Sequence, residues 1–378
     1  MKRILVICYS PLHRDPRVLR QIKALEGFDI ATAGYTAPQS GIIEFVRLNE
    51  EGTKTFFKKI FNAISTLFGF VTHTYWTVSK VSDFNRLIKG GKTDWIIAND
   101  LEALPIGLKV AEHYHAKIVF DAHEYFPGYL QKKDLRSLLR RVKILRLCKK
   151  YLNKPDYFTV VSPGIQKLYK NNFGINSYLI TNATSFQNLA PQSVKKNKIN
   201  LVHHGIAAPA RRIELMIQMM DKLRKEFVLH LYLMQTEDYK AYWVELNKLA
   251  SKYPSRVFFH DTVATNFIPE EINKYDIGVF LLPPTNINYK FALPNKFFEF
   301  VQARLAIAIG PSVDMKVFVD RYQLGVVTKD FSIESFSRAL NSLSIEEIMK
   351  FKMNANVAAP ELCAEENMKY YRELILNN

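Results

Sequence analysis

The chain has 378 residues, of which 48% are hydrophobic and 23% are charged, a balance typical of folded globular proteins. This length is enough for two domains with buried cores, which excludes a disordered tail and a disulfide-stabilised miniprotein. The three cysteines, Cys8, Cys148 and Cys363, lie far apart with no His or Cys at ligand spacing, which excludes a zinc motif and favours a reducing cytoplasm. No apolar run approaches the roughly 18 residues that a membrane span needs.

The formal net charge of +16 is confined to one half of the chain. Residues 1–200 contain 31 Lys and Arg against 15 Asp and Glu, whereas residues 201–378 contain 21 of each. A strongly basic half favours an anionic partner. Membrane phospholipid, a lipid-linked phosphate and nucleic acid all satisfy this requirement, and composition does not choose among them.

The first half predicts an alternation of short β-branched strands and longer helices. The predicted strands cover residues 4–8, 29–33, 95–98, 117–121, 157–161 and 178–181. A helix is expected at residues 16–26, and Ser162-Pro163 predicts another helix start, because Ser is a good N-cap and Pro fits the first helical position. This alternation is the sequence form of βαβ units and therefore of a parallel sheet.

A polar stretch at residues 182–197 has no apolar period and is typical of a linker. The alternation then restarts, with strands predicted at residues 199–203, 228–233, 256–260, 277–281 and 306–309. We therefore predict two parallel-sheet domains, residues 1–185 and 199–358, joined by a linker at residues 186–198. Residues 359–378 are expected to form a helix that returns to the first domain.

Ligands of open parallel sheets bind at the carboxyl ends of the strands, and the strongest motif follows such a strand. Residues 293–299, LPNKFFE, predict a turn and a helix that starts near Asn295. Backbone N–H groups at a helix start and the Lys296 side chain suit a diphosphate, and the Glu299 carboxylate suits the two hydroxyls of a ribose. A capped helix whose Lys and Glu side chains are solvated explains the same pattern.

A second candidate is the loop at residues 203–214, after the first strand of the second domain. Its small residues permit a ligand to approach the backbone, and its arginines can pair with phosphate oxygens. The loop lacks the Gly-x-Gly-x-x-Gly pattern, which argues against a dinucleotide-dependent dehydrogenase.

Together these segments resemble the GT-B glycosyltransferases, and among them the family-4-type retaining enzymes that use nucleotide-sugar donors. The resemblance covers nearly the whole chain and rests on the order and spacing of six segments, at residues 15–18, 99–100, 120–124, 161–162, 204–211 and 293–299. It implies an α/β fold of two Rossmann-like parallel-sheet domains that face a central cleft, with the nucleotide held by the second domain and the acceptor by the first.

The resemblance also implies roles for individual residues. The predicted catalytic residues are His123, Arg211 and Lys296. His123 is directed to the donor sugar, and Arg211 and Lys296 stabilise the departing diphosphate. The predicted donor-binding residues are Gly205, Pro294, Asn295 and Glu299. The residues predicted to contact the acceptor or the sugar are Asp15, Arg17, Asp100 and Glu124.

Structural explanations exist for several of these positions. His123 can be a structural histidine bonded to the backbone. Asp15 can cap a helix that begins with proline, and Asp100 and Glu124 can each cap a helix. The sequence does not decide between these alternatives and the functional ones.

The sequence departs from the family's pattern at two positions. The first carboxylate of the Glu-x7-Glu pattern falls at Phe291, which cannot make the side-chain contact of that carboxylate to the transferred sugar. Backbone N–H groups within residues 292–296 can still serve there. Arg212 stands where glycine is more usual. The chain also contains no Asp-x-Asp, the metal-binding signature of the other large glycosyltransferase fold, so we expect no metal and no cofactor.

Two basic stretches, residues 55–71 and 132–150, have apolar side chains at helical spacing. Cationic amphipathic helices dock on anionic membrane surfaces. Ordinary packing against a core with a solvated basic face gives the same pattern. We expect the chain to associate with an anionic membrane surface, at the inner face and from the cytoplasm.

The sequence thus predicts a glycosyltransferase that moves a sugar from a UDP- or GDP-sugar to a lipid-linked or cell-surface polysaccharide acceptor, with retention implied by the resemblance. A sugar-nucleotide epimerase of the same fold is the alternative enzyme. A nucleic-acid-binding protein explains the basic half, but it leaves the nucleotide-like second domain without a role, and no recognition motif for nucleic acid is present. We therefore expect no nucleic-acid partner.

Overall fold

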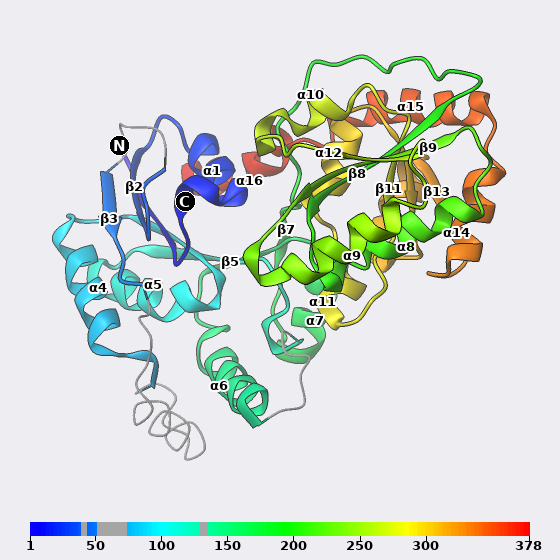
Figure 1. Cartoon of the computed structure of the whole chain (residues 1–378). Coiled ribbons are helices and arrows are strands. Elements are labelled where there is room, and N and C mark those ends of the chain that lie inside the picture. Colours follow the sequence, from blue (N-terminus) through cyan, green and yellow to red (C-terminus); the bar gives the residue numbers. More distant parts are fainter. Residues whose placement is uncertain (39–43, 51–73, 129–134) are drawn as a thin grey trace. The chain divides into compact units, whose positions relative to one another are not determined.

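The computed structural model describes residues 1–38, 44–50, 74–128 and 135–378 (Figure 1). The helix predicted at residues 55–71 lies outside these ranges. Contacts between residues divide the chain into two units. The first comprises Met1–Thr181, Asn286–Asn288 and Met368–Asn378, and the second comprises Asn182–Thr285 and Tyr289–Asn367. The linker predicted at residues 186–198 is grouped with the second unit.

The first unit contains a seven-stranded, all-parallel sheet of order β3-β2-β1-β4-β5-β6-β7. Its strands are β1 (Arg3–Cys8), β2 (Asp29–Gly34), β3 (Glu44–Arg47), β4 (Trp95–Asn99), β5 (Lys117–Ala122), β6 (Tyr157–Val160) and β7 (Tyr178–Leu179). The helices along this part of the chain are η1 (Leu12–Arg14), α1 (Pro16–Ala24), α4 (Val78–Lys89), α5 (Asp100–Tyr114), η2 (Phe126–Gly128), α6 (Leu135–Tyr151) and α7 (Pro163–Phe173).

The second unit contains a six-stranded, all-parallel sheet of order β10-β9-β8-β11-β12-β13. Its strands are β8 (Ile199–Ile206), β9 (Phe227–Met234), β10 (Val257–His260), β11 (Ile277–Phe280), β12 (Ala306–Ile309) and β13 (Gly325–Val327). The helices that follow β8 are η3 (Pro209–Arg211), α8 (Ile213–Gln218), η4 (Met219–Asp221), η5 (Glu237–Tyr239), α9 (Lys240–Ala250), η6 (Thr265–Phe267), α10 (Ile268–Ile272), α11 (Ile287–Lys290), α12 (Asn295–Gln302), α13 (Val313–Tyr322), α14 (Ile333–Asn341), α15 (Ile345–Ala358) and α16 (Ala364–Leu376).

The prediction of two parallel-sheet α/β domains is confirmed, and each predicted strand is present within a few residues of its expected bounds. Two strands, β3 and β13, were not predicted from the sequence. Both are edge strands, of four and three residues, and most of their side chains are partly exposed. Short edge strands lack the continuous apolar run that marks a strand buried on both faces.

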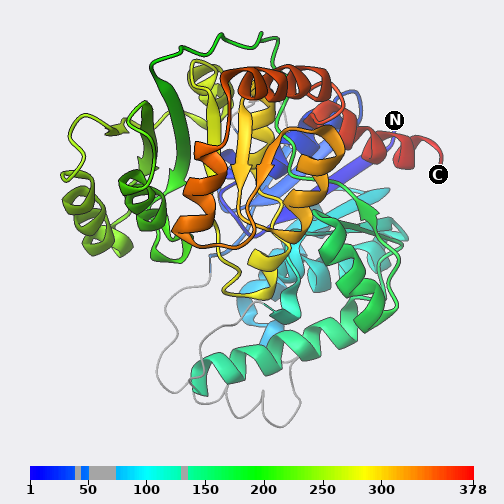
Figure 2. The same cartoon turned by 90° about the vertical axis from the view of Figure 1, so that its right-hand side faces the viewer.

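Both faces of the second sheet are buried, which requires apolar side chains on each side. Ala306 and Ala308 belong to the core on one face, whereas Ile307 and Ile309 belong to the core on the other. Helices cover the two faces, as the orange and green elements show in Figure 2. In the first unit, side chains of α16 such as Tyr371 are buried in the same core as those of β1.

A glycine lets α12 lie close to the second sheet. A Cβ atom added at Gly278 of β11 would lie 2.4 Å from Cγ of Phe300, a buried residue of α12. Because a side chain at residue 278 would push this helix away, the close approach fixes the position of α12 and of the polar side chains in its first turns.

Among the described residues, no helix has both the length and the apolar character required to span a bilayer.

Candidate functional site

The order of the strands identifies where a ligand is expected in each unit. The direction of the chain connections reverses between β1 and β4 in the first sheet and between β8 and β11 in the second. Ligands of open α/β sheets bind beyond the carboxyl ends of the strands at such a reversal. The structure brings the predicted site residues to these two places, as one cluster in each unit.

In the second unit, the centre of the cluster is the Lys296 side chain. Its Nζ atom lies 3.1 Å from Nε2 of His203 and 4.5 Å from the centre of the Phe280 ring. His203 Nδ1 lies 2.9 Å from the carbonyl oxygen of Val279, which assigns the ring proton to Nδ1 and leaves Nε2 as the acceptor. The Lys296 ammonium therefore donates a hydrogen bond to a neutral imidazole.

Lys296 is a buried cation, with 9% of its surface exposed. Burial lowers the pKa of the Lys296 ammonium well below its ordinary value, and the positive charge of Arg211 lowers it further, while Glu299 opposes the shift. In the part of the chain that the structure describes, no carboxylate forms an ion pair with Lys296. A buried amine of this kind is stabilised when an anion binds beside it.

Gly205 lies directly against Lys296. Its φ of +131° falls in the region that favours glycine. A Cβ atom at this position would lie 3.3 Å from Lys296 Nζ. The backbone conformation thus favours glycine, and a side chain at this position would require the Lys296 ammonium to shift by a few tenths of an ångström.

Arg211 is the last residue of η3, in the loop that follows β8. Its guanidinium lies 5.5 Å from the centre of the Tyr289 ring. The next residue, Arg212, has φ of +52°, which is the left-handed conformation that glycine adopts most readily. This conformation gives a physical reason why glycine is more usual at that position.

The helix that carries Lys296 begins without a side-chain cap. Pro294 is its N-cap residue, and proline has no polar side-chain atom to accept hydrogen bonds from the first turn. Asn295 is the first helical residue. This helix start thus has the positive end of a helix dipole and no side chain that caps it at the N-cap, an arrangement that favours an anion.

Glu299 lies one turn after Asn295, and 4% of its side chain is exposed. Its Oε2 atom lies 3.3 Å from Nε2 of His204. Burial and the charge of Lys296 lower the pKa of the His204 imidazole well below its ordinary value. The side chains of Lys296, His204 and Glu299 therefore interact electrostatically, at the C-terminal end of β8 and the first turns of α12.

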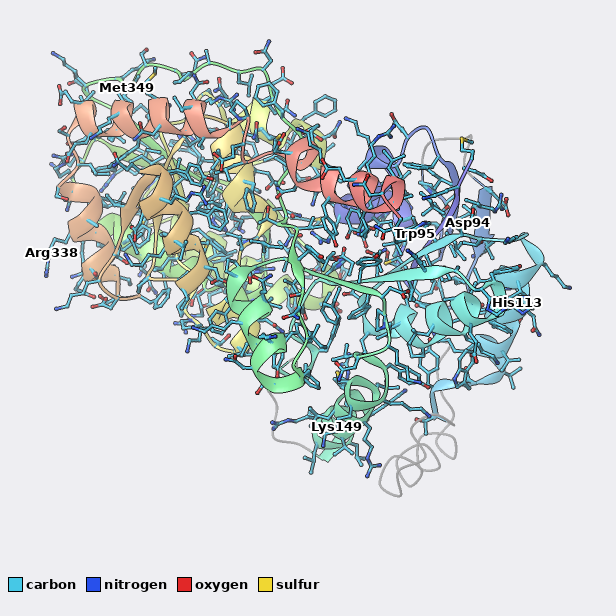
Figure 3. The ribbon with its side chains drawn as sticks, turned by 180° about the vertical axis from the view of Figure 1, so that it is seen from behind. Asp94, Trp95, His113, Lys149, Arg338 and Met349 are labelled. Carbon is cyan, nitrogen blue, oxygen red and sulfur yellow. The ribbon has the colours of Figure 1, made fainter. Side chains whose placement is uncertain are left out.

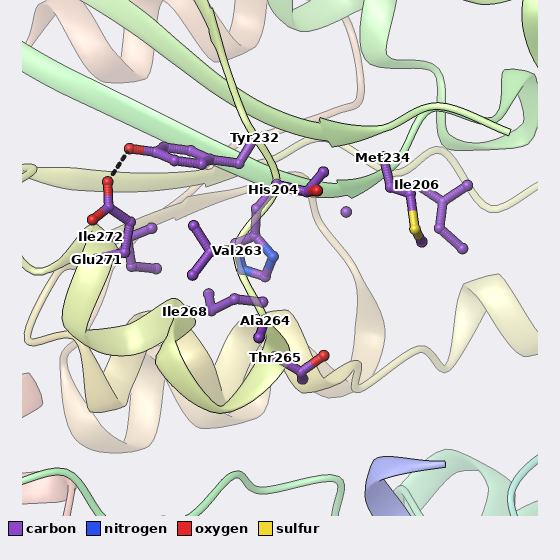
Figure 4. A pocket seen from close by; sticks show the side chains of 12 residues that line it. His204, Ile206, Tyr232, Met234, Val263, Ala264, Thr265, Ile268, Glu271 and Ile272 are labelled. Carbon is purple, nitrogen blue, oxygen red and sulfur yellow. Dashed lines mark hydrogen bonds between the residues drawn. The ribbon is translucent and has the colours of Figure 1, made fainter. Parts of the chain in front are cut away.

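A pocket of about 230 Å³ opens beside this cluster (Figure 4). Two pairs of its lining residues are neighbours across β8 and β9, His204 with Tyr232 and Ile206 with Met234. The Tyr232 hydroxyl donates a 2.6 Å hydrogen bond to the Glu271 carboxylate. The remaining lining residues, most of them apolar or small, are Gly205, Thr262, Val263, Ala264, Thr265, Ile268 and Ile272.

The first unit has its own cluster, built on a buried ion pair. The Arg17 guanidinium donates two hydrogen bonds of 2.6 Å to the Asp121 carboxylate. Arg17 is 4% exposed and Asp121 is fully buried. Arg17 also donates to the carbonyl oxygens of Ile180 and Thr181. Arg17 therefore connects the Asp121 carboxylate to the backbone of Ile180 and Thr181.

His123 lies between two carboxylates of this cluster. Its Nε2 atom is 3.3 Å from Asp121 Oδ2, and its Nδ1 atom is 3.4 Å from Asp100 Oδ2. Burial disfavours the charged imidazole, but the two carboxylates outweigh this effect, so that the pKa of His123 is raised. Asp100 adopts a left-handed conformation, with φ of +66°, a strained geometry that places its carboxylate beside the ring.

The other predicted contacts of the first unit have structural partners. Asp15 caps α1, because its carboxylate accepts a 3.3 Å hydrogen bond from the N–H of Val18, and it also accepts one from the Ser10 hydroxyl. The carbonyl oxygen of Glu124 accepts a 2.9 Å hydrogen bond from the Tyr169 hydroxyl. The structural explanation of Asp15 as a helix cap is therefore confirmed, and its functional role stays a prediction.

The structure adds residues to which the sequence assigned no individual role. They are Asp121, His203, His204, Tyr232 and Glu271. The adjacent histidines before Gly205 were a usable signal, since two polar rings interrupt the apolar pattern at the end of a strand. Tyr232 and Glu271 gave no local signal, because they reach the pocket from other strands and helices.

Within the described residues, no three His, Cys, Asp or Glu side chains come together as a set that holds a metal ion. Independence of a metal stays a prediction.

No protein-family model matches the chain, and no curated protein matches it either. Several solved structures match the chain in fold. HepE from Anabaena, in complex with UDP, has a TM-score of 0.73 at 13% identity, and the match covers 100% of both chains. Sucrose-phosphate synthase from Thermosynechococcus elongatus has the same TM-score, identity and coverage.

The lipopolysaccharide outer core galactosyltransferase WaaB is a third match, with a TM-score of 0.61 at 10% identity over 99% of both chains. Identities this low establish the fold and nothing further. The matches extend over the whole chain and therefore include both parallel-sheet units. The fold is the one that the sequence predicts: the chain has the GT-B fold of glycosyltransferases.

Proposed function

We propose that the protein is a glycosyltransferase that uses a nucleotide-sugar donor. The observation that carries this proposal is the buried Lys296 ammonium, which has Gly205 and a neutral His203 beside it and lies at the carboxyl end of β8. A buried cation next to the backbone of a glycine at a strand end suits a diphosphate. We assign the adjacent pocket to the nucleoside and the buried Glu299 carboxylate, which lies beside His204, to the hydroxyls of its ribose.

The proposed reaction transfers the sugar while a nucleoside diphosphate departs. Negative charge develops on the leaving phosphate, and fixed cations stabilise it more in the transition state than in the ground state. Lys296 and Arg211 are the residues that supply this charge, without a metal ion. Retention of configuration follows the family resemblance and involves attack from the face of the leaving group, with the phosphate accepting the proton of the acceptor.

His123 is proposed to orient a hydroxyl of the transferred sugar. Its two carboxylate neighbours favour the protonated ring, and a protonated imidazole donates hydrogen bonds but does not accept a proton. We therefore assign His123 to binding and orientation of a sugar hydroxyl, and proton shuttling near neutral pH is the alternative role.

A UDP-sugar is the donor that we favour over a GDP-sugar, because HepE, which shares the fold over its whole length, is in complex with UDP. A thermal-shift screen with UDP- and GDP-sugars tests the choice. Product analysis with the donor alone then separates transfer from epimerisation, because an epimerase converts its donor without any acceptor.

We further propose that the acceptor is lipid-linked or a cell-surface polysaccharide and that the basic first half meets an anionic membrane surface. Helix α6 carries exposed cations along its length, Arg140, Arg141, Lys149 and Lys150, and Lys149 is labelled in Figure 3. Leu138 of the same helix is 55% exposed. Exposed cations beside an exposed apolar side chain favour binding at a lipid surface.

The α6 cations should control binding to anionic vesicles. Replacing Arg140, Arg141, Lys149 and Lys150 by Gln should lower binding to vesicles that contain phosphatidylserine at least tenfold, since each basic residue near such a surface contributes about 1 kcal/mol. Vesicle sedimentation measures the change. A matched control replaces four exposed lysines of the second unit by Gln, Lys222, Lys225, Lys248 and Lys316, and should bind like the wild type. Equal binding of all three proteins contradicts the proposal.

Glu299→Ala should weaken nucleotide binding tenfold or more. The variant removes a buried carboxylate that we assign to the ribose hydroxyls, and a lost charge-assisted hydrogen bond has about this effect. Calorimetric titration with UDP and GDP measures the affinity. Glu334→Ala, an exposed residue of α14 in the same unit, is the control and should bind like the wild type. An unchanged affinity of Glu299→Ala contradicts the assignment.

A further inference from the structure

Two helices of the second unit expose apolar side chains in matching positions. Val313 and Val317 of α13 are 42% and 52% exposed. Met353 and Val357 of α15 are 50% and 77% exposed. In each helix the two residues are four positions apart, so they lie on one face, one turn above the other. Single exposed apolar side chains are normal on protein surfaces, whereas aligned ones form a patch that indicates an interaction surface.

The two pairs of apolar residues belong to one face of the second unit. One turn beyond Val317, the Arg321 guanidinium lies 3.4 Å from the carboxylate of Glu361, which is one turn beyond Val357. The hydroxyl of Tyr322, at the end of α13, also donates a hydrogen bond to Glu361. Both helices pack on the same core of the unit. Their outward apolar residues therefore form one surface, which we call the α13–α15 face.

Charged residues of opposite sign continue the apolar stripe of α15 at its two ends. Lys350 comes three residues before Met353, and Glu361 comes four residues after Val357, in the turn that follows the helix. Both charged side chains are exposed. At 1.5 Å per residue, they lie roughly 8 and 9 Å on either side of the midpoint between Met353 and Val357. Because the two charges have opposite signs at nearly equal distances, the stripe is complementary to an antiparallel copy of itself.

We propose that the α13–α15 face binds a second copy of this chain in a two-fold symmetric dimer. A two-fold axis brings the same patch of both copies together, so that every contact occurs twice. With the two α15 helices antiparallel, Met353 packs against Val357 of the partner subunit, and Lys350 pairs with Glu361 of the partner subunit. The Glu361 carboxylate can keep its contact with Arg321, because it has two oxygens that each accept hydrogen bonds.

The size of the face determines how stable this dimer is. Helices of 14 and 10 residues present fewer side chains than the about 20–30 residues a side of a standard interface. We therefore expect a reversible dimer that dissociates at micromolar concentrations.

Sedimentation equilibrium of the full chain, from about 1 µM to about 200 µM, tests the dimer. The wild type should change from monomer to dimer over this range. Val357→Asp places a charge in the centre of the apolar stripe and should raise the dissociation constant at least tenfold. Val244→Asp is the matched control, at a valine of α9 that is 61% exposed, and it should dimerise like the wild type.

An exchange of charges tests the antiparallel arrangement. Lys350→Glu and Glu361→Lys each place like charges opposite one another, so each should weaken the dimer at least tenfold. The double variant restores opposite charges in exchanged positions and should regain most of the affinity. Lys350→Glu combined with Glu334→Lys, at an exposed residue of α14, restores the net charge but not the pair, and should stay weak. Thermal unfolding verifies that each variant is folded.

The proposal is overturned if the wild type stays monomeric up to about 200 µM. It is also overturned if Val357→Asp and Lys350→Glu both dimerise like the wild type, because the contact then lies elsewhere on the chain. If the wild type is monomeric and Val357→Asp lowers its sedimentation with vesicles that contain phosphatidylserine, the α13–α15 face binds lipid in place of a second copy. If the exchanged charges do not regain affinity, the antiparallel pairing of α15 is wrong.

Discussion

Replacing Lys296 by Ala should lower kcat/KM for sugar transfer by about 10²- to 10³-fold, equivalent to roughly 3–4 kcal/mol of transition-state stabilisation. The expected loss is large because Lys296 is buried, and a buried cation acts on the departing diphosphate in a medium of low dielectric constant. Its hydrogen bond to His203 holds the ammonium in place before the reaction begins. Initial rates with the donor identified by thermal shift measure the loss.

Two variants define the meaning of this result. Lys296→Met removes the charge but retains an apolar chain of similar length, so it should show a comparable loss of activity without a cavity. Lys316→Ala, at an exposed lysine of α13 that pairs with Asp320, should keep wild-type activity. Activity of Lys296→Met within threefold of the wild type would show that the charge does not stabilise the transition state.

Replacing Asp121 by Ala should destabilise the first unit by about 3–5 kcal/mol, because it leaves the Arg17 guanidinium buried without its counter-charge. Arg17 and Asp121 are 4% and 0% exposed. Asp121 also accepts hydrogen bonds of 2.5 and 2.6 Å from Gln21 and Thr159. Native-state hydrogen exchange at the amides of β5 measures the unfolding free energy of this unit without interference from the other.

A second variant tests the cause of this loss. The double variant Arg17→Met, Asp121→Leu removes both charges and should regain a large part of the lost stability. Asp320→Ala breaks an exposed pair with Lys316 and should cost less than about 1 kcal/mol. If the unfolding free energy of Asp121→Ala is within about 1 kcal/mol of the wild-type value, the buried ion pair does not stabilise the first unit as predicted.

The same pair predicts the effect of acid. Arg17 and His123 hold the pKa of the Asp121 carboxyl below its ordinary value of 3.8 in the folded protein, although burial acts in the opposite direction. A carboxyl whose pKa is lower in the folded state stabilises that state above its unfolded pKa, and this stabilisation is lost as the pH falls below about 4. Asp121→Ala removes this contribution, so its stability should vary less with pH in that range.

Local sequence predicts most of the fold. The strands in the centres of the two sheets, such as β4 and β12, belong to short apolar runs bounded by polar residues, glycine or proline, and this pattern arises because both of their faces are buried. The edge strands β3 and β13 do not have this pattern, because at least one side of an edge strand meets solvent. Their pairing is determined by the neighbouring strand.

The candidate site was predictable only in part. The start of α12, with Lys296 and Glu299 three residues apart, follows from the motif LPNKFFE and from helix geometry. The partners of these side chains, His203 and His204, are about 90 residues earlier in the chain, and only the order of β8 and β11 brings them to α12. The sequence also offered Arg17 as a ligand contact, which stays a prediction, but it gave no sign of the buried ion pair of Arg17 with Asp121.

The sequence by itself therefore determined the two parallel-sheet units, the helix that begins after Pro294 and the excess of positive charge in the first half, because periodicity, capping and composition are local properties. Only the tertiary structure decided which charges are buried and which pairs neutralise each other. These properties depend on desolvation, and the desolvation of a side chain is set by residues that are distant in the sequence.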